Sequence, residues 1–223
     1  MQDKIFAVYK PKGPTSHDIV DEIRKLTGEQ RVGHAGTLDP LASGVLVIGV
    51  GREATKNLKE VVVAEKEYIA KIRLGRTSTT DDAEGEKKEI NVKNYPSREE
   101  IAQTLKNNFE GKIHQTPPIF SAIKINGREA YKLARRGMDV SLKPRTVEIK
   151  SISLVRYQWP FLELRAVTGP GVYIRSLARD LGRALKTGGY LADLERVRVG
   201  QFRKEDTVTL KLNASRLSAR SYL

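Results

Sequence analysis

Residues 33–50 read GHAGTLDPLASGVLVIGV, a glycine-rich loop that runs directly into an apolar segment. Gly33, Gly36 and Gly44 permit tight turns and a close approach of the backbone to a ligand. The run 45–50 is short, apolar and β-branched, which is typical of a strand buried on both faces. Asp39 precedes Pro40, and a following proline biases a residue toward an extended backbone. The stretch therefore predicts a rigid buried strand whose preceding loop presents a carboxylate.

Further elements can be read on both sides of this stretch. Thr15 and Asp18 form a capping-box pattern that opens a helix, and Gly28 is a natural end for it. The residues between Gly188 and the end of the chain predict only short strands. Hydrophobic periodicity and turn residues predict the remaining elements, which are strands at 4–9, 68–74, 145–156 and 161–167 and helices at 53–62, 97–111 and 173–186.

The order of these elements decides the fold class. Strands and helices are interspersed without strict βαβ alternation, which favours an α+β fold over a doubly wound one. We therefore expect a central mixed, mainly antiparallel sheet flanked by helices. The chain shows no repeat and no long low-complexity linker. A single domain over residues 1–223 is expected.

Composition excludes several classes of protein. The 223 residues include no cysteine, which excludes disulfides, thiolate zinc sites, iron–sulfur clusters and thiol catalysis. The three histidines, His17, His34 and His114, do not have metal-ligand spacing, so no metal is expected. The longest apolar run is far shorter than a membrane span, and the N-terminal residues lack a signal-peptide core. These features predict a cytoplasmic protein with no membrane partner.

Charge is unevenly distributed along the chain. The sequence contains 40 Lys and Arg against 27 Asp and Glu, a formal net charge of +13. Residues 121–150 carry eight basic and three acidic side chains, whereas residues 76–100 carry five basic and seven acidic ones. A uniformly charged surface would serve solubility alone. A basic face instead indicates an anionic partner, of which nucleic acid is the leading candidate.

Asp39 alone does not identify an active site, because an aspartate in a loop is usually a turn or cap residue. Five ordered segments, however, closely resemble the TruB family of tRNA pseudouridine synthases. They are KPKGPTSHDIV at 10–20, GHAGTLDPLASGVL at 33–46, KEYIAKIRLG at 66–75, QTPPIFSAIKINGREAYKLARRG at 115–137 and VYIRSLARDLG at 172–182. The resemblance implies the pseudouridine synthase fold and isomerisation of the T-loop uridine at tRNA position 55. It also implies the tRNA T-arm as partner and no cofactor, since substrate and product contain the same atoms.

The resemblance further implies roles for individual residues. Asp39 would be the catalytic aspartate, Tyr68 would stack on the target uracil, and Arg175 would pair with the Asp39 carboxylate. An adjacent arginine favours the ionised aspartate, and an enzyme that extrudes a base must offer it a stacking surface. The remaining expected pocket residues contact the RNA. They are His34, which would fill the space left by the flipped base, Tyr173, Leu194 and Arg196.

Two features depart from the family pattern. The loop after the Tyr68 strand reads GRTSTTDDAEG at 75–85, where the family resembles G-x-x-T-D-T-x-D-x-x-G, so the loop's first aspartate is missing. Bacterial relatives also commonly carry a C-terminal PUA domain. Because the sequence reaches only Leu223, that domain is expected to be absent or minimal.

Two other functions are compatible with the sequence. One is a guide-RNA-dependent pseudouridine synthase of the dyskerin type, and the other is a tRNA-binding chaperone without catalysis. The bacterial character of LDPLASGVL at 38–46 disfavours the first, and the presence of Asp39, Tyr68 and Arg175 together disfavours the second. No residue pattern identifies a protein partner.

Overall fold

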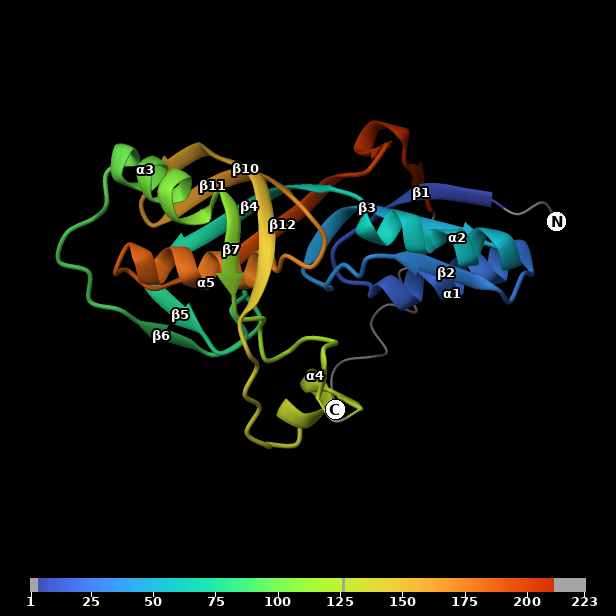
Figure 1. The fold of residues 1–223 in the computed structure, drawn as a ribbon, viewed down its shortest axis with the longest axis horizontal. Helices are drawn as coiled ribbons and strands as arrows, with labels where there is room; N and C mark the ends of the chain where they lie inside the picture. Colours follow the sequence, from blue (N-terminus) through green and yellow to red (C-terminus); the bar gives the residue numbers. More distant parts are fainter. Residues whose placement is uncertain (1–3, 126, 211–223) are drawn as a thin grey trace. The chain divides into compact units, whose positions relative to one another are not determined.

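The computed structural model describes residues 4–125 and 127–210. The chain divides into two compact units, one formed by residues up to 68 together with those from 194 onward, the other by residues 69–193. The boundary falls within two strands, β4 (Lys66–Leu74) and β12 (Gly189–Val199). The sequence predicts one domain, whereas the described residues form these two units, whose elements are labelled in Figure 1.

The first unit is built on the apolar run identified above, which forms β3 (Ala42–Val50) and is buried at every position. β3 lies antiparallel to β1 (Lys4–Lys10) and to β2 (Val32–Ala35). It is parallel to β12, with Arg196 opposite Gly44. Two short strands complete this part of the sheet, β13 (Phe202–Arg203) beside β12 and β14 (Val208–Thr209) beside β1.

Two helices pack on this part of the sheet, α1 (Ser16–Thr27) and α2 (Arg52–Val63). Alternate residues of β3 belong to different core clusters, Leu46 with Ile19 of α1 and Val45 with Leu58 of α2. Since successive side chains of a strand point to opposite faces, the two helices bury both faces of β3. The capping box of α1 is confirmed, and Gly28 ends the helix in the left-handed conformation.

The second unit contains a long hairpin and the helices that cover it. β10 and β11 pair antiparallel, and β7 pairs antiparallel with the other edge of β10. In strand order, β4 lies next to β11. The amphipathic helix predicted at 173–186 is α5, and its Leu177 and Leu181 are fully buried. The elements are β7 (Gly111–Gln115), β10 (Arg145–Gln158), β11 (Phe161–Thr168), α3 (Arg98–Phe109) and α5 (Ile174–Ala184).

Two small hairpins and a short helix also belong to this unit. β5 (Arg76–Ser78) pairs with β6 (Lys87–Glu89); β5 lies within the segment 75–85 that is read as a loop in the sequence, and β6 follows it. β8 (Lys124–Ile125) and β9 (Arg128–Glu129) form a short hairpin with Gly127 in its turn, while Asn126 lies outside the described residues. α4 (Ala130–Ala134) follows and has a small apolar cluster of its own, which contains Ala130, Leu133 and Val140.

The predicted fold class is confirmed, since the sheet is mixed and mainly antiparallel and helices flank it. The prediction of short strands after Gly188 is wrong for residues 189–199, which form the long strand β12, whereas β13 and β14 are short as predicted. The charged residues of β12 hide the strand pattern, and two of them, Arg196 and Arg198, find partners inside the protein. Within the part of the chain that the structure describes, no helix is long and apolar enough to cross a membrane.

Candidate active site

Asp39 lies in the loop between β2 and β3, and its neighbours on both sides are fixed by the segment that begins α1. The Ser16 hydroxyl donates to the Leu38 carbonyl at 3.0 Å and accepts from the Leu38 amide at 2.9 Å. The Gly13 amide donates to the Pro40 carbonyl at 2.8 Å. The Asp39 carbonyl accepts from the amide of Ala42, the first residue of β3, at 3.0 Å. The backbone that carries this half-buried carboxylate is therefore held at several points.

A buried arginine lies beside this loop. Arg196, on β12, is 1% exposed, and its guanidinium donates to the carbonyls of Val45 and Gly36 at 2.8 Å each. Burial lowers the pKa of Arg196, while a hydrogen bond with Tyr68 and the nearby Asp39 charge raise it. Arg196 thus connects the loop of Asp39 with the ring that is expected to stack on uracil.

Gly44 allows strands β3 and β12 to come close together beside Arg196. It stands opposite Arg196 in the parallel β3–β12 pair and has a φ of 110°, a conformation that favours glycine. A Cβ atom at this position would lie 2.1 Å from the Arg196 carbonyl oxygen. The glycine-rich loop of the sequence therefore serves here for the close approach of two strands.

Two buried lysines add positive charge to the same unit. Burial lowers the pKa of Lys10 and of Lys66 to about 8 each. The Lys10 ammonium donates to the carbonyls of Pro11 and Pro14 at 2.8 Å each, and the charge of Asp39 partly offsets the effect of burial on its pKa. The candidate catalytic carboxylate therefore lies in an electropositive environment formed by its own unit.

The other predicted residues of this unit are His34, Tyr68 and Leu194. Burial lowers the pKa of His34 to about 4, with smaller contributions from His17 and Arg196, so its imidazole is neutral at pH 7. The ring of His34 makes an edge-to-face contact with His17, with centroids 5.5 Å apart. Tyr68 on β4 and Leu194 on β12 are both buried, and Leu194 stands opposite Ala42 at the start of β3.

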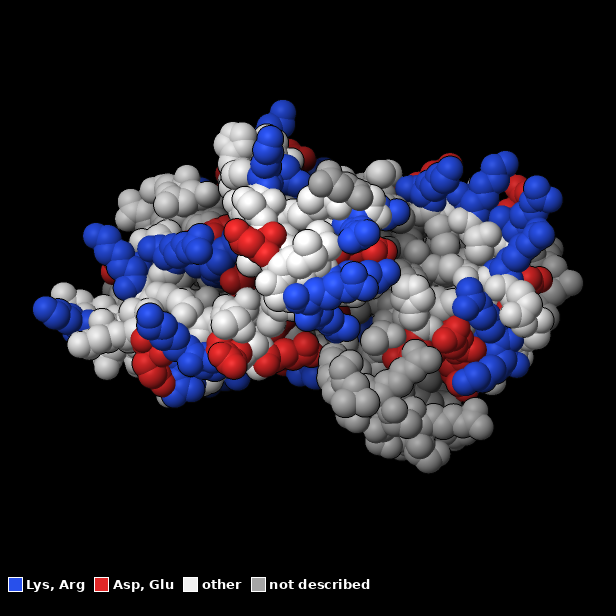
Figure 2. Space-filling model, turned by 90° about the horizontal axis from the view of Figure 1, so that it is seen from below, with Lys and Arg blue, Asp and Glu red and all other residues white. Residues whose placement is uncertain are grey.

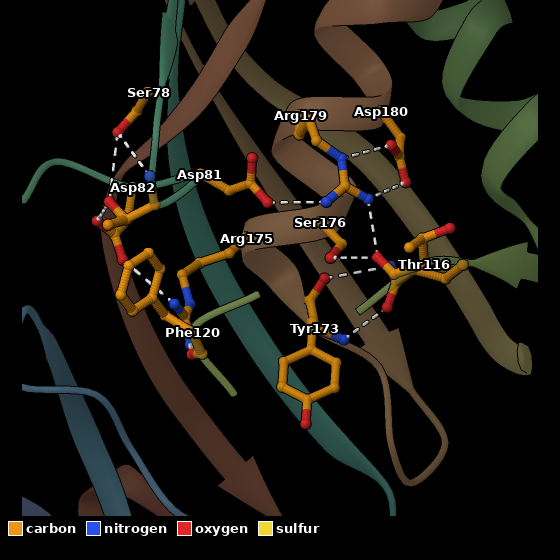
Figure 3. Close-up of polar contacts among 12 residues, drawn as sticks. Ser78, Asp81, Asp82, Thr116, Phe120, Tyr173, Arg175, Ser176, Arg179 and Asp180 are labelled. Atoms are coloured by element: carbon orange, nitrogen blue, oxygen red, sulfur yellow. Dashed lines mark hydrogen bonds and ion pairs between the residues drawn. The ribbon is translucent and has the colours of Figure 1, made fainter. Parts of the chain in front are cut away.

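Tyr173 and Arg175 lie in the second unit, at the start of α5. The Arg175 guanidinium contacts the Asp82 carboxylate at 3.5 Å and donates to the Phe120 carbonyl at 3.0 Å, and both charged side chains are buried (Figure 3). The Gln115 side-chain amide binds both backbone groups of Tyr173, donating to its carbonyl at 3.2 Å and accepting from its amide at 2.8 Å.

A second arginine of α5, one turn after Arg175, extends this network. Arg179 pairs with Asp81 at 2.8 Å and with Asp180 at 2.9 Å, and it donates to the Thr116 carbonyl at 2.8 Å. In Figure 3, Arg175 and Arg179 reach from α5 toward the loop that contains Asp81 and Asp82. Burial raises the pKa of Asp81, an effect that the charge of Arg179 opposes.

Sequence reasoning missed Ser16, Asp81, Asp82 and Arg179. Two arginines four residues apart share one helix face, and two adjacent aspartates in a polar loop are a suitable partner for them. That combination indicates that the arginines of α5 pair with aspartates, although it does not reveal which loop provides the aspartates. The hydroxyl of Ser16 gives no such signal, because serine is ordinary at the start of a helix.

The structure places five predicted site residues in the first unit and two in the second. The first five are Asp39, Tyr68, His34, Leu194 and Arg196, and the other two are Tyr173 and Arg175. Arg196, which was predicted to bind RNA, has its guanidinium directed to backbone carbonyls inside the protein. The pairing of Arg175 with Asp39 stays a prediction. Among residues 4–125 and 127–210, no group of three His, Asp or Glu side chains could hold a metal ion.

Two family models match this chain. The model described as "TruB family pseudouridylate synthase (N terminal domain)" matches residues 24–174, and that described as "tRNA pseudouridylate synthase B C-terminal domain" matches residues 175–218. Together they extend over most of the chain. The residues of the site lie within the matched ranges except those that precede residue 24, namely Lys10, Pro11, Gly13, Pro14, Ser16 and His17.

Curated relatives agree with these models. A protein of Thermobifida fusca named tRNA pseudouridine synthase B is 44% identical over 218 residues, which cover 94% of this chain and 74% of that protein. A protein of Clostridium kluyveri with the same name is 41% identical over 210 residues, covering 94% of this chain and 71% of that protein. The similarity therefore extends over most of both partners.

A solved structure confirms the fold. A chain from the "Crystal Structure of a Cbf5-Nop10-Gar1 Complex" is similar to this one with a TM-score of 0.71 and 31% identity. The match covers 92% of this chain and 52% of the other, so this chain spans about half the length of that one.

Proposed function

Since this chain belongs to the TruB family of pseudouridine synthases, we propose that it isomerises uridine to pseudouridine in tRNA, at the T-loop uridine of position 55. The observation that carries the proposal is the loop of Asp39. The backbone of this loop is held by hydrogen bonds on both sides of Asp39, and the buried Arg196 lies near both Asp39 and Tyr68. An enzyme that acts on tRNA would work where tRNA is, and we therefore place it in the cytoplasm.

The reaction moves the ribose C1′ from N1 of the uracil to C5. The C1′–N1 bond breaks, a C1′–C5 bond forms, the hydrogen on C5 leaves as a proton, and N1 gains a proton. Asp39 is the group that drives cleavage of the glycosidic bond, since it is the carboxylate of the loop and a fixed backbone keeps it in the geometry that the step requires. The atoms of substrate and product are the same, so the step consumes no reductant and no energy source.

Tyr68 and His34 serve the flipped base. A uridine in a folded T-loop must leave its stack before its C1′ can be reached. Tyr68 offers a buried aromatic surface beside Arg196. His34 is neutral at pH 7, and a neutral ring can take the space left by the base without bringing a charge into it. The roles proposed for Arg175, Tyr173 and Leu194 are those that the family resemblance implies.

The tRNA T-arm is the proposed partner. The hairpin of β8 and β9, α4 and the residues after it carry exposed basic side chains, namely Lys124, Arg128, Lys132, Arg135, Arg136 and Lys143. Figure 2, seen from the side on which Figure 1 draws α4, shows a group of Lys and Arg side chains near the centre of the view. Such side chains can bind the phosphates of the RNA, with an affinity that falls as salt rises.

A second candidate follows from the similarity to the chain of the Cbf5-Nop10-Gar1 complex. In this case the chain would need a guide RNA to select its target. The greater identity to the bacterial tRNA pseudouridine synthase B proteins favours the stand-alone enzyme. Activity on a T-stem-loop transcript with no other component would separate the two.

The central experiment compares the wild-type protein with Asp39→Asn. Both are incubated with the T-stem-loop transcript and with total tRNA, and pseudouridine is mapped. The wild type is expected to modify position 55, whereas Asp39→Asn is expected to bind the transcript with unchanged affinity and form no product, because an amide cannot replace the carboxylate. Full turnover by Asp39→Asn would refute the role of Asp39. Absence of pseudouridine with the wild type would refute the activity.

A further inference from the structure

We propose that Ser16 is a positioning residue for Asp39. Ser16 is 1% exposed and its hydroxyl binds both backbone groups of Leu38, the residue directly before Asp39. Leu38 is itself buried, so its amide and carbonyl have these hydrogen bonds in place of contacts with water. The proposal rests on the proposed function, in which Asp39 is catalytic.

The position of Ser16 suits this role. It is the first residue of α1, and the capping box of Thr15 and Asp18 fixes where that helix begins. The Asp18 carboxylate accepts from the Thr15 amide at 2.8 Å, and the Thr15 hydroxyl accepts from the Asp18 amide at 3.1 Å. The hydroxyl of Ser16 is therefore carried by the capped first turn of α1. It binds the backbone of Leu38, which is 22 residues further along the chain.

The same segment holds the other side of Asp39. The Gly13 amide binds the Pro40 carbonyl, and the Lys10 ammonium binds the carbonyls of Pro11 and Pro14 within the same turn. Leu38 and Pro40 are thus both bound by residues 13–16, and Asp39 lies between them. Because both neighbours are fixed, the backbone of Asp39 has little freedom to move. Its carboxylate is therefore kept in a defined position, as a reaction at a single carbon of the ribose requires.

Ser16 does not reach the reacting atoms in this scheme. Its contacts are with the backbone of Leu38, so its effect on the reaction passes through the position of Asp39. Loss of the hydroxyl should lower the rate of the chemical step and leave RNA binding intact. A residue that only stabilised α1 would have a different effect, since its loss would lower the stability and not the rate of the folded enzyme.

The test is Ser16→Ala with Thr15→Ala as the matched control. Both variants alter the start of α1, and both are expected to lower the melting temperature by a few degrees. Ser16→Ala should lower kcat on the T-stem-loop transcript by about 10- to 100-fold, the scale expected for a displaced reacting group, with KM and RNA affinity unchanged. Thr15→Ala should keep kcat within about twofold of the wild type, because it leaves the Ser16–Leu38 hydrogen bonds in place.

Hydrogen exchange gives a readout at the contact itself. The Leu38 amide should exchange faster in Ser16→Ala than in the wild type, and not in Thr15→Ala. If Ser16→Ala does not fold, Ser16→Cys keeps the side-chain volume with a weaker hydrogen-bonding atom and should show an intermediate kcat.

Several outcomes would overturn the proposal. A kcat for Ser16→Ala equal to that of the wild type, or an equal loss in Thr15→Ala, would show that Ser16 does not position Asp39. If Ser16→Ala is fully active while Asp39→Asn is inactive, only the role of Ser16 fails. If the wild type forms no pseudouridine, the proposed function fails and this inference fails with it.

Discussion

Arg196, Lys10 and Lys66 are three cations that the first unit keeps out of water. Each is held by backbone carbonyl oxygens, which accept hydrogen bonds from the charged groups and offset part of the cost of burial. The charge of Asp39 acts on two of them, Lys10 and Arg196. At the scale of single residues, the site is therefore an aspartate placed against fixed positive charge.

Lys10 permits a prediction about pH. Its pKa is about 8 in the folded protein and 10.5 in the unfolded chain. Between these values the unfolded chain binds a proton that the folded protein does not, so the free energy of unfolding rises as pH rises through this window. Lys10→Met removes the contribution of this group, and the rise from pH 7.5 to pH 10 should be smaller by roughly 2 kcal/mol than in the wild type.

Urea denaturation of both proteins at the two pH values measures this difference. Lys66 titrates in the same window, so part of the rise should persist in Lys10→Met. An identical pH dependence in the two proteins would contradict a lowered pKa at Lys10. Lys59→Met provides the control, since it makes the same substitution at an exposed lysine of the same unit.

Sequence alone identifies Asp39 and Tyr68 as candidates because each stands in a recognisable motif. It does not identify the supports of Asp39. Ser16 is 22 residues from its partner Leu38, and Arg196 is 160 residues from Gly36. Such contacts depend on strand pairing and helix packing, which local residue patterns do not encode. A charged residue such as Arg196 is therefore read as exposed until the strand order is known.

At the scale of elements, α5 is the organising helix of the second unit. Arg175 and Arg179 lie one turn apart and bind two segments that are remote in sequence. Asp81 and Asp82 belong to one segment, and the carbonyls of Thr116 and Phe120 belong to the other (Figure 3). The helix thus fixes the loop in which this chain departs from its family's pattern. Asp81, which has a φ of 61°, adopts a conformation that is uncommon for a residue other than glycine.

A double-mutant cycle on Asp81 and Arg179 tests this arrangement. Arg179→Met should lower the free energy of unfolding by about 2 to 4 kcal/mol, because it removes the arginine that pairs with the partly buried Asp81. Asp81→Asn should lower it by less, because Arg179 keeps its ion pair with Asp180. The double variant should lose less than the sum of the two, with a coupling of about 1 to 3 kcal/mol. Urea denaturation of the four proteins measures it.

The control is Arg183, an exposed arginine of the same helix that lies near Asp180. Their nitrogen and oxygen atoms are 3.7 Å apart and the Arg183 side chain is 72% exposed. Arg183→Met should therefore change the free energy of unfolding by less than about 0.5 kcal/mol. Strictly additive losses at Asp81 and Arg179 would show that the pair does not hold the loop to the helix.

Elements differ in how well local patterns predict them. The helices α1, α2, α3 and α5 match their expected bounds closely, because caps and periodicity are local signals.

β12 does not show the alternation of a half-buried strand, since its charged residues are bound inside the protein. Arg196 binds backbone carbonyls, and Arg198 pairs with Glu67 at 3.0 Å. β7 follows α3 directly at Gly111, and its pairing with β10 depends on a contact more than thirty residues away.

At the scale of the whole molecule, the net charge of +13 does not by itself show which surface binds the RNA phosphates. Basic residues are exposed in both units, for example on α2 and around α4. Net charge by itself would attract RNA to either surface. The proposed function assigns the phosphate contacts to the segment of β8, β9 and α4, and this assignment makes a quantitative prediction about salt.

The variant Lys124→Gln, Arg128→Gln and Arg136→Gln removes three exposed charges from that segment. Arg52→Gln, Lys56→Gln and Lys59→Gln on α2 removes the same number and gives the same net charge. Each phosphate contact contributes about 0.7 to 0.9 to the slope of log Kobs against log salt, so the first variant should lower the slope by about 2 to 3 and the second by close to zero. Binding of the T-stem-loop transcript across a salt titration measures both slopes. Equal slopes for the two variants would mean that RNA binding depends on the total charge and not on the segment of β8, β9 and α4. A larger decrease in slope for the α2 variant would indicate that the RNA phosphates contact α2 instead.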